Sequence, residues 1–155
     1  MKCLRLFHKR QFSWLFYLIV LATGSCQQIE TGDSLSRDQI EYIQQLGLLD
    51  KNEKIIRFYS EFKKKVAGNF FTDKRMASYW MDENDSTKNE KNFAFYKDIV
   101  SIDTNYMRGA ETYAPYMMVT TAKGNSFKVC ADGKHAAVKS FFETAIAKWK
   151  SEKNK

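Results

Sequence analysis

Few side chains in this sequence are of the kinds that catalyse reactions or bind metals. His135 is one of two histidines, and Cys130 is one of three cysteines. A catalytic histidine needs a nucleophile and an orienting acid, and the residues near His135 indicate neither. A zinc site needs about four ligands, and no further ligand pair accompanies His135 and Cys130. We therefore expect a non-enzymatic protein with no metal ion and no cofactor.

An acidic stretch, Asp82 to Ser86, has the composition of the start of a calcium-binding loop. In such loops the sixth residue is Gly and the twelfth is Glu, whereas here they are Thr87 and Phe93. This stretch is more simply a solvated loop between strands. The seven glycines form no phosphate-binding motif, so the sequence indicates no small-molecule substrate.

The net charge of +7 is partly a property of the N-terminus. Residues 1–25 contain four bases and no acid, and removing these four from the 25 bases leaves 21 against 18 acids, a net charge of +3. Such a mildly basic domain does not have the concentrated positive charge of a nucleic-acid-binding surface. We therefore expect no nucleic-acid partner. The apolar content of 44% suits one compact domain.

Residues 1–25 have the pattern of a signal peptide. A basic segment, Met1 to Gln11, precedes the short apolar run Phe12 to Ala22. This run is shorter than the roughly 20 residues that a membrane-spanning helix needs. A true N-terminal membrane anchor remains the alternative.

The end of this signal, Thr23-Gly24-Ser25-Cys26, resembles the lipobox of bacterial lipoproteins, with Thr23 where Leu is usual. The resemblance implies cleavage before Cys26 and lipidation of its thiol. Gln27 after the cysteine implies transport to the outer membrane, so we expect a lipid-anchored protein of the cell envelope. Residues 26–34 then form a polar tether. Cys130 is left without a partner, and a Cys26–Cys130 disulfide is the alternative.

Residues 35–49 predict a short helix. Ser36 and Gln39 have the spacing of a capping box, and Gly47 is the residue expected after the helix end. From Glu53 the apolar residues alternate, which predicts strands. Within Lys54 to Phe62 the alternation places Ile56 and Phe58 on one face. The segment 93–106 is long enough for two strands, and Gly124-Asn125 marks a hairpin between 116–121 and 126–131.

The last long segment, Asp132 to Lys150, predicts an amphipathic helix. Its apolar residues recur every three or four positions and need an apolar surface to pack on. They are Val138, Phe141, Phe142, Ala145, Ile146 and Trp149. Six or seven strands followed by one helix favour an α+β, mainly β fold: an antiparallel sheet curled into a partial barrel and capped by the C-terminal helix.

This order of elements resembles the bacterial pleckstrin-homology-like domains. The resemblance covers residues 52–151, with 152–155 as a tail. It is carried by the terminal helix and by three segments: Glu53-Lys54-Ile55-Ile56, Phe71-Thr72-Asp73-Lys74-Arg75 and Asp98-Ile99-Val100-Ser101-Ile102-Asp103. Other β-barrels with a helix are the alternative.

Two groups of residues are candidates for binding. In lipid-binding pleckstrin-homology domains, the loop between the first two strands carries basic residues, and the resemblance places a lysine run in that loop. The candidate contacts to an anionic surface are Lys63, Lys64, Lys65, Lys74 and Arg75. The second group is aromatic, because Tyr often carries protein interfaces. Its members are Tyr106, Tyr113 and Tyr116.

The leading expectation is an envelope domain that binds a protein or peptide, whose identity the sequence leaves open. The first alternative is docking on anionic lipid through the basic loop. The second is an immunity- or inhibitor-type protein that neutralises a toxin or an enzyme.

Overall fold

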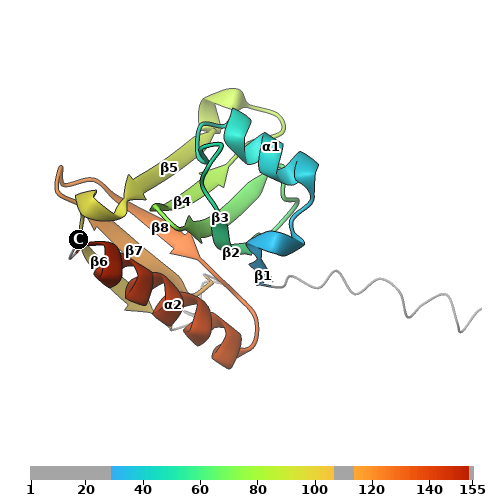
Figure 1. Cartoon of the computed structure of the whole chain (residues 1–155). Helices are drawn as coiled ribbons and strands as arrows, with labels where there is room; N and C mark the ends of the chain where they lie inside the picture. Colours follow the sequence, from blue (N-terminus) through green and yellow to red (C-terminus); the bar gives the residue numbers. More distant parts are fainter. Residues whose placement is uncertain (1–28, 107–113, 154–155) are drawn as a thin grey trace, which may run out of the picture.

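The computed structural model describes residues 29–106 and 114–153. Its strands form two antiparallel sheets (Figure 1). The first sheet has the order β1-β2-β3-β4-β5, and the second has the order β6-β7-β8. The strands are β1 (Glu30–Thr31), β2 (Ile55–Tyr59), β3 (Ala67–Thr72), β4 (Arg75–Trp80), β5 (Glu90–Phe95), β6 (Ile99–Asn105), β7 (Tyr116–Thr121) and β8 (Ser126–Cys130).

Two α-helices and three short 3-10 helices complete the described fold. They are α1 (Arg37–Gln45), α2 (His135–Lys153), η2 (Gly32–Ser34), η3 (Ser86–Lys88) and η4 (Tyr96–Asp98). The expected mainly β class with a C-terminal helix is confirmed. The expected single curled sheet is instead two sheets with no closed barrel, because η4 turns the chain from β5 into β6 and so breaks the ladder.

The C-terminal helix packs as its apolar stripe predicts. Val138, Phe141, Phe142 and Ala145 are buried, and Ile146 and Trp149 pack on the same cluster. Phe141 meets Phe71 of the first sheet edge to face, with ring centroids 5.2 Å apart. The helix therefore closes a core that both sheets share. It extends to Lys153, so residues 152 and 153, which were predicted to belong to a tail, are helical.

Helix α1 covers the other face of the first sheet, away from α2 (Figure 1). Its capping box is present, since Ser36 Oγ accepts from the Gln39 N–H and Gln39 Oε1 accepts from the Ser36 N–H. Gly47 follows with φ +78°. Ile43 is buried against Phe58 and Phe70 of the sheet. The predicted short helix is thus an integral layer of the domain.

Because both faces of the first sheet are covered, β3 is buried along its whole length. The predicted alternation in β2 is wrong. A bulge between Ile55 and Arg57 shifts the register, so Ile56 packs on the core beneath α2 and Phe58 on the core beneath α1.

Part of the predicted tether also belongs to the fold. Residues 30–34 form β1 and η2, and Glu30 pairs with Phe58 of β2. The Glu30 carboxylate also contacts Lys64 Nζ at 2.6 Å. The predicted tether at 26–34 is therefore too long at its C-terminal end.

Candidate functional site

The first sheet carries a row of polar residues on the face that looks toward the second sheet. Asn69, Ser78 and Asn92 are direct cross-strand partners on β3, β4 and β5. The next row on this face, two residues along each strand, is Phe71, Met76 and Ala94, and it lies in the core. The inner face thus changes from apolar to polar between these two neighbouring rows.

This polar row lines a cleft of about 540 Å³ between the first sheet and β8. The lining residues are Glu61, Asn69, Ser78, Tyr79, Trp80, Glu90, Asn92, Ser126, Phe127, Lys128 and Cys130. Strand β8 is the outer strand of its sheet, so the cleft runs along a sheet edge. A cleft of this size next to an edge strand can receive an extended peptide segment.

Asn69 holds the two walls of the cleft together. It is 4% exposed. Its Oδ1 accepts a hydrogen bond from the Cys130 N–H at 2.9 Å, and its Nδ2 donates to Glu61 Oε2 at 2.8 Å. One amide therefore fixes the distance between the sheets and orients a carboxylate at the cleft.

Two lining residues are available to a ligand. Ser78 is 8% exposed and lines the cleft. Trp80 is 40% exposed although it is one of the largest apolar side chains of the chain. An exposed indole is an apolar surface in contact with water, and a bound ligand that covers it removes this unfavourable contact.

The electrostatics of the cleft disfavour a reactive cysteine. Burial and, to a lesser extent, the charge of Glu61 raise the pKa of the Cys130 thiol to about 11, although the charge of Lys128 acts in the opposite direction. The thiol is therefore protonated at neutral pH and is a poor nucleophile. Burial also raises the pKa of the Glu61 carboxyl, while its bonds to its own backbone N–H and to Asn69 act in the opposite direction.

The predicted basic surface is divided by the fold. Lys63, Lys64 and Lys65 precede β3, whereas Lys74 follows it. The six residues of β3 span about 20 Å, so these lysines lie at opposite ends of the strand. Lys63 and Lys64 are ion-paired with Glu83 and Glu30.

The prediction that Arg75 contacts an anionic surface is wrong, because Arg75 is 2% exposed. Its Nε and Nη2 donate to the two carboxylate oxygens of Glu53 at 2.9 and 2.6 Å. Nη2 also contacts Asp50, and the guanidinium lies over the Phe95 ring at 4.4 Å. Arg75 therefore ties the chain after α1 to the first sheet and cannot face a membrane.

The predicted aromatic group does not form one groove. Tyr106 contacts Phe142 of α2, with ring centroids 5.3 Å apart. Tyr116 lies on the opposite face of the second sheet, where its hydroxyl accepts from Asn105 Nδ2 and Lys128 Nζ lies 4.6 Å from its ring centroid. Tyr113 lies outside the described residues, as does Cys26.

His135 and the acidic loop were the remaining candidates for catalysis or metal binding. His135 is exposed, and its ring lies 6.0 Å from that of Tyr106. In the acidic loop, Asp82 Oδ1 accepts from the backbone N–H groups of Asn84 and Asp85. Within residues 29–106 and 114–153 there is no group of three residues able to hold a metal ion.

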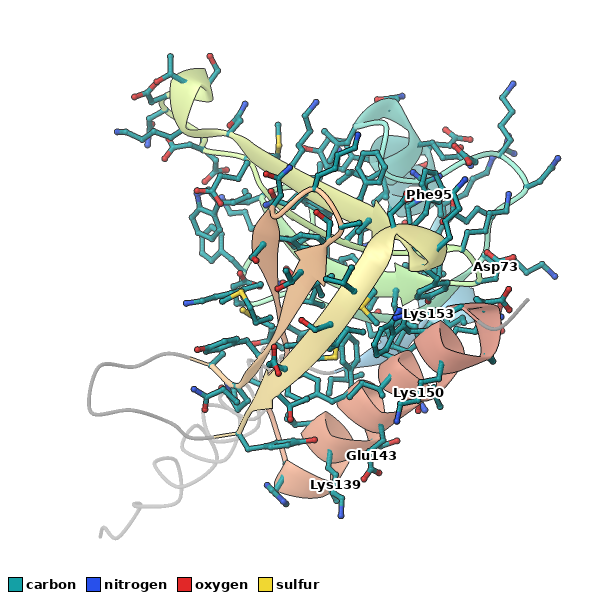
Figure 2. All side chains as sticks on the ribbon, turned by 90° about the vertical axis from the view of Figure 1, so that its left-hand side faces the viewer. Asp73, Phe95, Lys139, Glu143, Lys150 and Lys153 are labelled. Atoms are coloured by element: carbon teal, nitrogen blue, oxygen red, sulfur yellow. The ribbon has the colours of Figure 1, made fainter. Side chains whose placement is uncertain are left out.

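A second cavity, of about 250 Å³, lies between the β3–β4 turn, η4 and the end of α2. Figure 2 shows Asp73 and Phe95 close to Lys153 at this end of the helix, with Lys139 and Glu143 near its start. Acids and bases alternate around this cavity, which gives it no clear ligand preference.

The cleft residues were missed as a site by sequence reasoning. Asn69 and Ser78 were assigned to strands, but a polar residue inside an otherwise apolar strand is a signal in itself. Asn69 interrupts Ala67-Gly68-Asn69-Phe70-Phe71, and this interruption marks the point where the core ends.

The fold places the domain in a class. This class is mainly β, with five antiparallel strands in the first sheet, three in the second and a C-terminal helix. A solved structure of a DUF1696 family protein with a pleckstrin-homology domain, from Shewanella loihica PV-4, is similar to this chain with a TM-score of 0.49 and 17% identity, covering 74% of this chain and 93% of that one. No protein family and no curated protein matches the sequence.

Proposed function

We propose that this chain is a lipid-anchored binding domain of the cell envelope, and that a protein or peptide segment binds in the cleft between the sheets. The observation that carries the proposal is the cleft wall itself, where the exposed Trp80 indole stands next to the polar cross-strand row of Asn69, Ser78 and Asn92. Binding, rather than chemistry, suits a cleft whose thiol is protonated.

The anchor supports this proposal from the sequence. The lipobox-like Cys26 stands four residues before Glu30, where the fold begins. Four residues reach at most about 14 Å, so a lipid at Cys26 would hold the domain close to the membrane surface. No helix among the described residues has the length and apolar composition needed to cross a bilayer.

Site-directed photo-crosslinking in the native envelope tests the cleft. A benzophenone amino acid in place of Trp80 should give one reproducible adduct, and the same group in place of the exposed Val100 on β6 should not. Asn92→Trp should fill the cleft and prevent the adduct at position 80. Equal adducts at both positions, or an adduct that survives Asn92→Trp, would contradict binding in the cleft.

Docking on anionic lipid is the alternative proposal, and Lys65 supports it, since it is exposed and makes no ion pair with a described residue. Sedimentation with anionic vesicles separates the two proposals. Lys63→Glu, Lys64→Glu and Lys65→Glu together should leave sedimentation of the fragment Gln27–Lys155 unchanged if the cleft is the functional site. An immunity- or inhibitor-type role is a special case of protein binding, and identifying the crosslinked partner decides it.

A further inference from the structure

Strand β5 forms one outer edge of the first sheet (Figure 1). It pairs with β4 along its whole length without a bulge. The Tyr96 N–H donates to the Lys74 carbonyl at 3.1 Å, so the even-numbered residues of β5 direct their backbone groups toward β4. The backbone N–H and C=O groups of Lys91 and Phe93 therefore point to the outer side, where they make no hydrogen bond with a described residue.

The other sheet edges carry features that prevent pairing with a further strand. Strand β1 is only two residues long, and β6 has a bulge between Ile99 and Ser101. At β8 the Cys130 N–H is already bonded to the Asn69 side chain. Short strands, bulges and covered backbone groups are the usual ways in which proteins protect a sheet edge. Strand β5 is six residues long and regular, so it lacks this protection.

The side chains at this edge are mostly apolar. Phe93 is 45% exposed, and its ring meets that of Phe95 edge to face, with centroids 5.7 Å apart. Phe93 lies on the α1 side of the sheet, because its cross-strand partner Ala77 belongs to the core beneath α1. The charged residues of the strand, Glu90 and Lys91, stand at its start. An unpaired backbone beside an exposed Phe ring is a surface that another strand can cover.

We infer that β5 pairs in the antiparallel direction with β5 of a second copy of this chain, about a twofold axis at Phe93. Such an interface requires a surface that complements itself. In this register the two Phe93 rings lie opposite each other, and Lys91 of each chain lies opposite Phe95 of the other. The Phe93 rings can then cover each other, and each ammonium can lie over a Phe95 ring.

Neighbouring antiparallel registers fit less well. An axis at Lys91 would place two like charges opposite each other, which destabilises a strand pair. An axis at Asn92 would place Lys91 opposite Phe93 and would leave Phe95 opposite Asn89, outside the strand. The register centred on Phe93 is therefore the one that gives each side chain on this face a suitable partner. The cleft lies on the opposite face of the sheet, so the inference is independent of the proposed function.

Disulfide crosslinking of the full chain in the native envelope tests the pairing. The background is Cys130→Ala, which removes the one cysteine that the structure describes and should give no dimer by itself. Phe93→Cys in this background should give a disulfide-linked dimer, since directly opposed residues of a hydrogen-bonded pair have Cα atoms about 5.5 Å apart. Val100→Cys is the matched control, because Val100 is 48% exposed on β6. It should give at least about tenfold less dimer, because two Val100 residues do not come within disulfide range.

A second pair of variants tests the register. Lys91→Cys combined with Phe95→Cys should also crosslink two chains, because these positions lie opposite each other. Lys91→Cys alone should not, since the two Lys91 residues are offset by four positions, about 13 Å along the strands.

Sedimentation equilibrium of the full chain in detergent gives an independent measurement. Phe93→Lys places two like charges opposite each other at the axis and should raise the dissociation constant of the dimer at least about tenfold. Val100→Lys adds the same charge to the other exposed position and should leave the constant unchanged. Circular dichroism confirms that each variant is folded.

Several results would overturn the inference. One is a Phe93→Cys chain that crosslinks no more than the Val100→Cys chain, and another is a natural chain that stays monomeric at all concentrations. Efficient crosslinking of Lys91→Cys with itself would also overturn it, because it requires a different axis. A crosslink from position 93 to a different protein would show that another partner covers this edge.

Discussion

The side-chain oxygen of Asn69 accepts a hydrogen bond from the Cys130 N–H at 2.9 Å, across 61 residues of sequence. This bond joins the inner face of the first sheet to the edge of the second. Asn69→Ala removes it, removes the bond to Glu61, and leaves a partly buried N–H without its acceptor. We expect a loss of about 1–3 kcal/mol in the free energy of unfolding, measured by urea denaturation.

Asn84→Ala is the control for this experiment, because Asn84 is exposed in the β4–β5 loop. It should change the free energy of unfolding by less than about 0.5 kcal/mol. Equal stability of the Asn69 and Asn84 variants would show that the two sheets are held together without the Asn69 side chain.

The buried Glu53–Arg75 pair predicts a large effect when one partner is removed. The side chains are 0% and 2% exposed, and Thr72 Oγ1 also donates to Glu53. Arg75→Met leaves a buried carboxylate without its cation, and we expect a loss of about 3–5 kcal/mol. Thermal or urea unfolding measures it.

Two further variants calibrate that result. Arg37→Met breaks the exposed Arg37–Glu41 pair and should cost less than about 0.5 kcal/mol. Adding Glu53→Met to Arg75→Met removes the unpaired charge and should recover part of the loss. A double variant no more stable than Arg75→Met alone would contradict the role given to the pair.

Glu61 predicts a pH dependence of stability. Burial raises the pKa of its carboxyl from the ordinary 4.5. The folded protein then binds this proton more tightly than the unfolded chain, so the contribution of Glu61 to stability falls as the pH rises from about 4.5 through the folded pKa. Glu61→Gln should therefore be more stable than the natural chain at pH 7, and the gain should shrink as the pH falls.

Urea denaturation at a series of pH values measures this difference. A gain that stays constant with pH would mean that the Glu61 charge is not the cause. A carboxylate kept in place at a cost to stability is typical of a binding site.

Helix α1 should be required for stability, since it covers a whole face of the first sheet. Ile43 is 1% exposed between α1 and the sheet. Ile43→Ala should cost about 2–5 kcal/mol, whereas Ile43→Val should cost about 0.5–1.5 kcal/mol. A negligible cost for both would contradict the packing of α1 as a layer of the domain.

The lipobox-like sequence around Cys26 predicts that the N-terminus is lipidated and cleaved. Cys26→Ala should prevent lipidation and cleavage before residue 26, so the protein should keep its full length on a gel and lack the acyl mass in mass spectrometry. Cys130→Ala is the control and should be processed normally. A Cys26→Ala protein of mature size in the membrane fraction would rule out the lipoprotein hypothesis.

Several elements could be predicted because their causes are close together in sequence. The Ser36–Gln39 capping box, the Gly124 hairpin with φ +83° and the apolar stripe of α2 depend on residues within a few positions of one another. The hydrogen bonds of a turn and the period of a helix depend on neighbouring residues, so they can be predicted from the sequence pattern.

The site could not be predicted in the same way. Arg75 follows Lys74 in the sequence, yet one is buried against Glu53 and the other is exposed. Whether each of these side chains is buried or exposed depends on the residues that it meets in the fold. For Arg75 this residue is Glu53, more than 20 positions away in the sequence. The bulge in β2 likewise changes which face Phe58 occupies, because one extra residue reverses every side chain beyond it.

The sequence by itself determined the class of fold, since the order of strands and the amphipathic last helix leave few ways to bury their apolar faces. Only the tertiary structure decided where the polar positions lie. Asn69, Ser78 and Glu61 come together at a cleft because the fold places β8 beside the first sheet. That placement depends on packing between segments far apart in the sequence, so it cannot be read from a local pattern of residues.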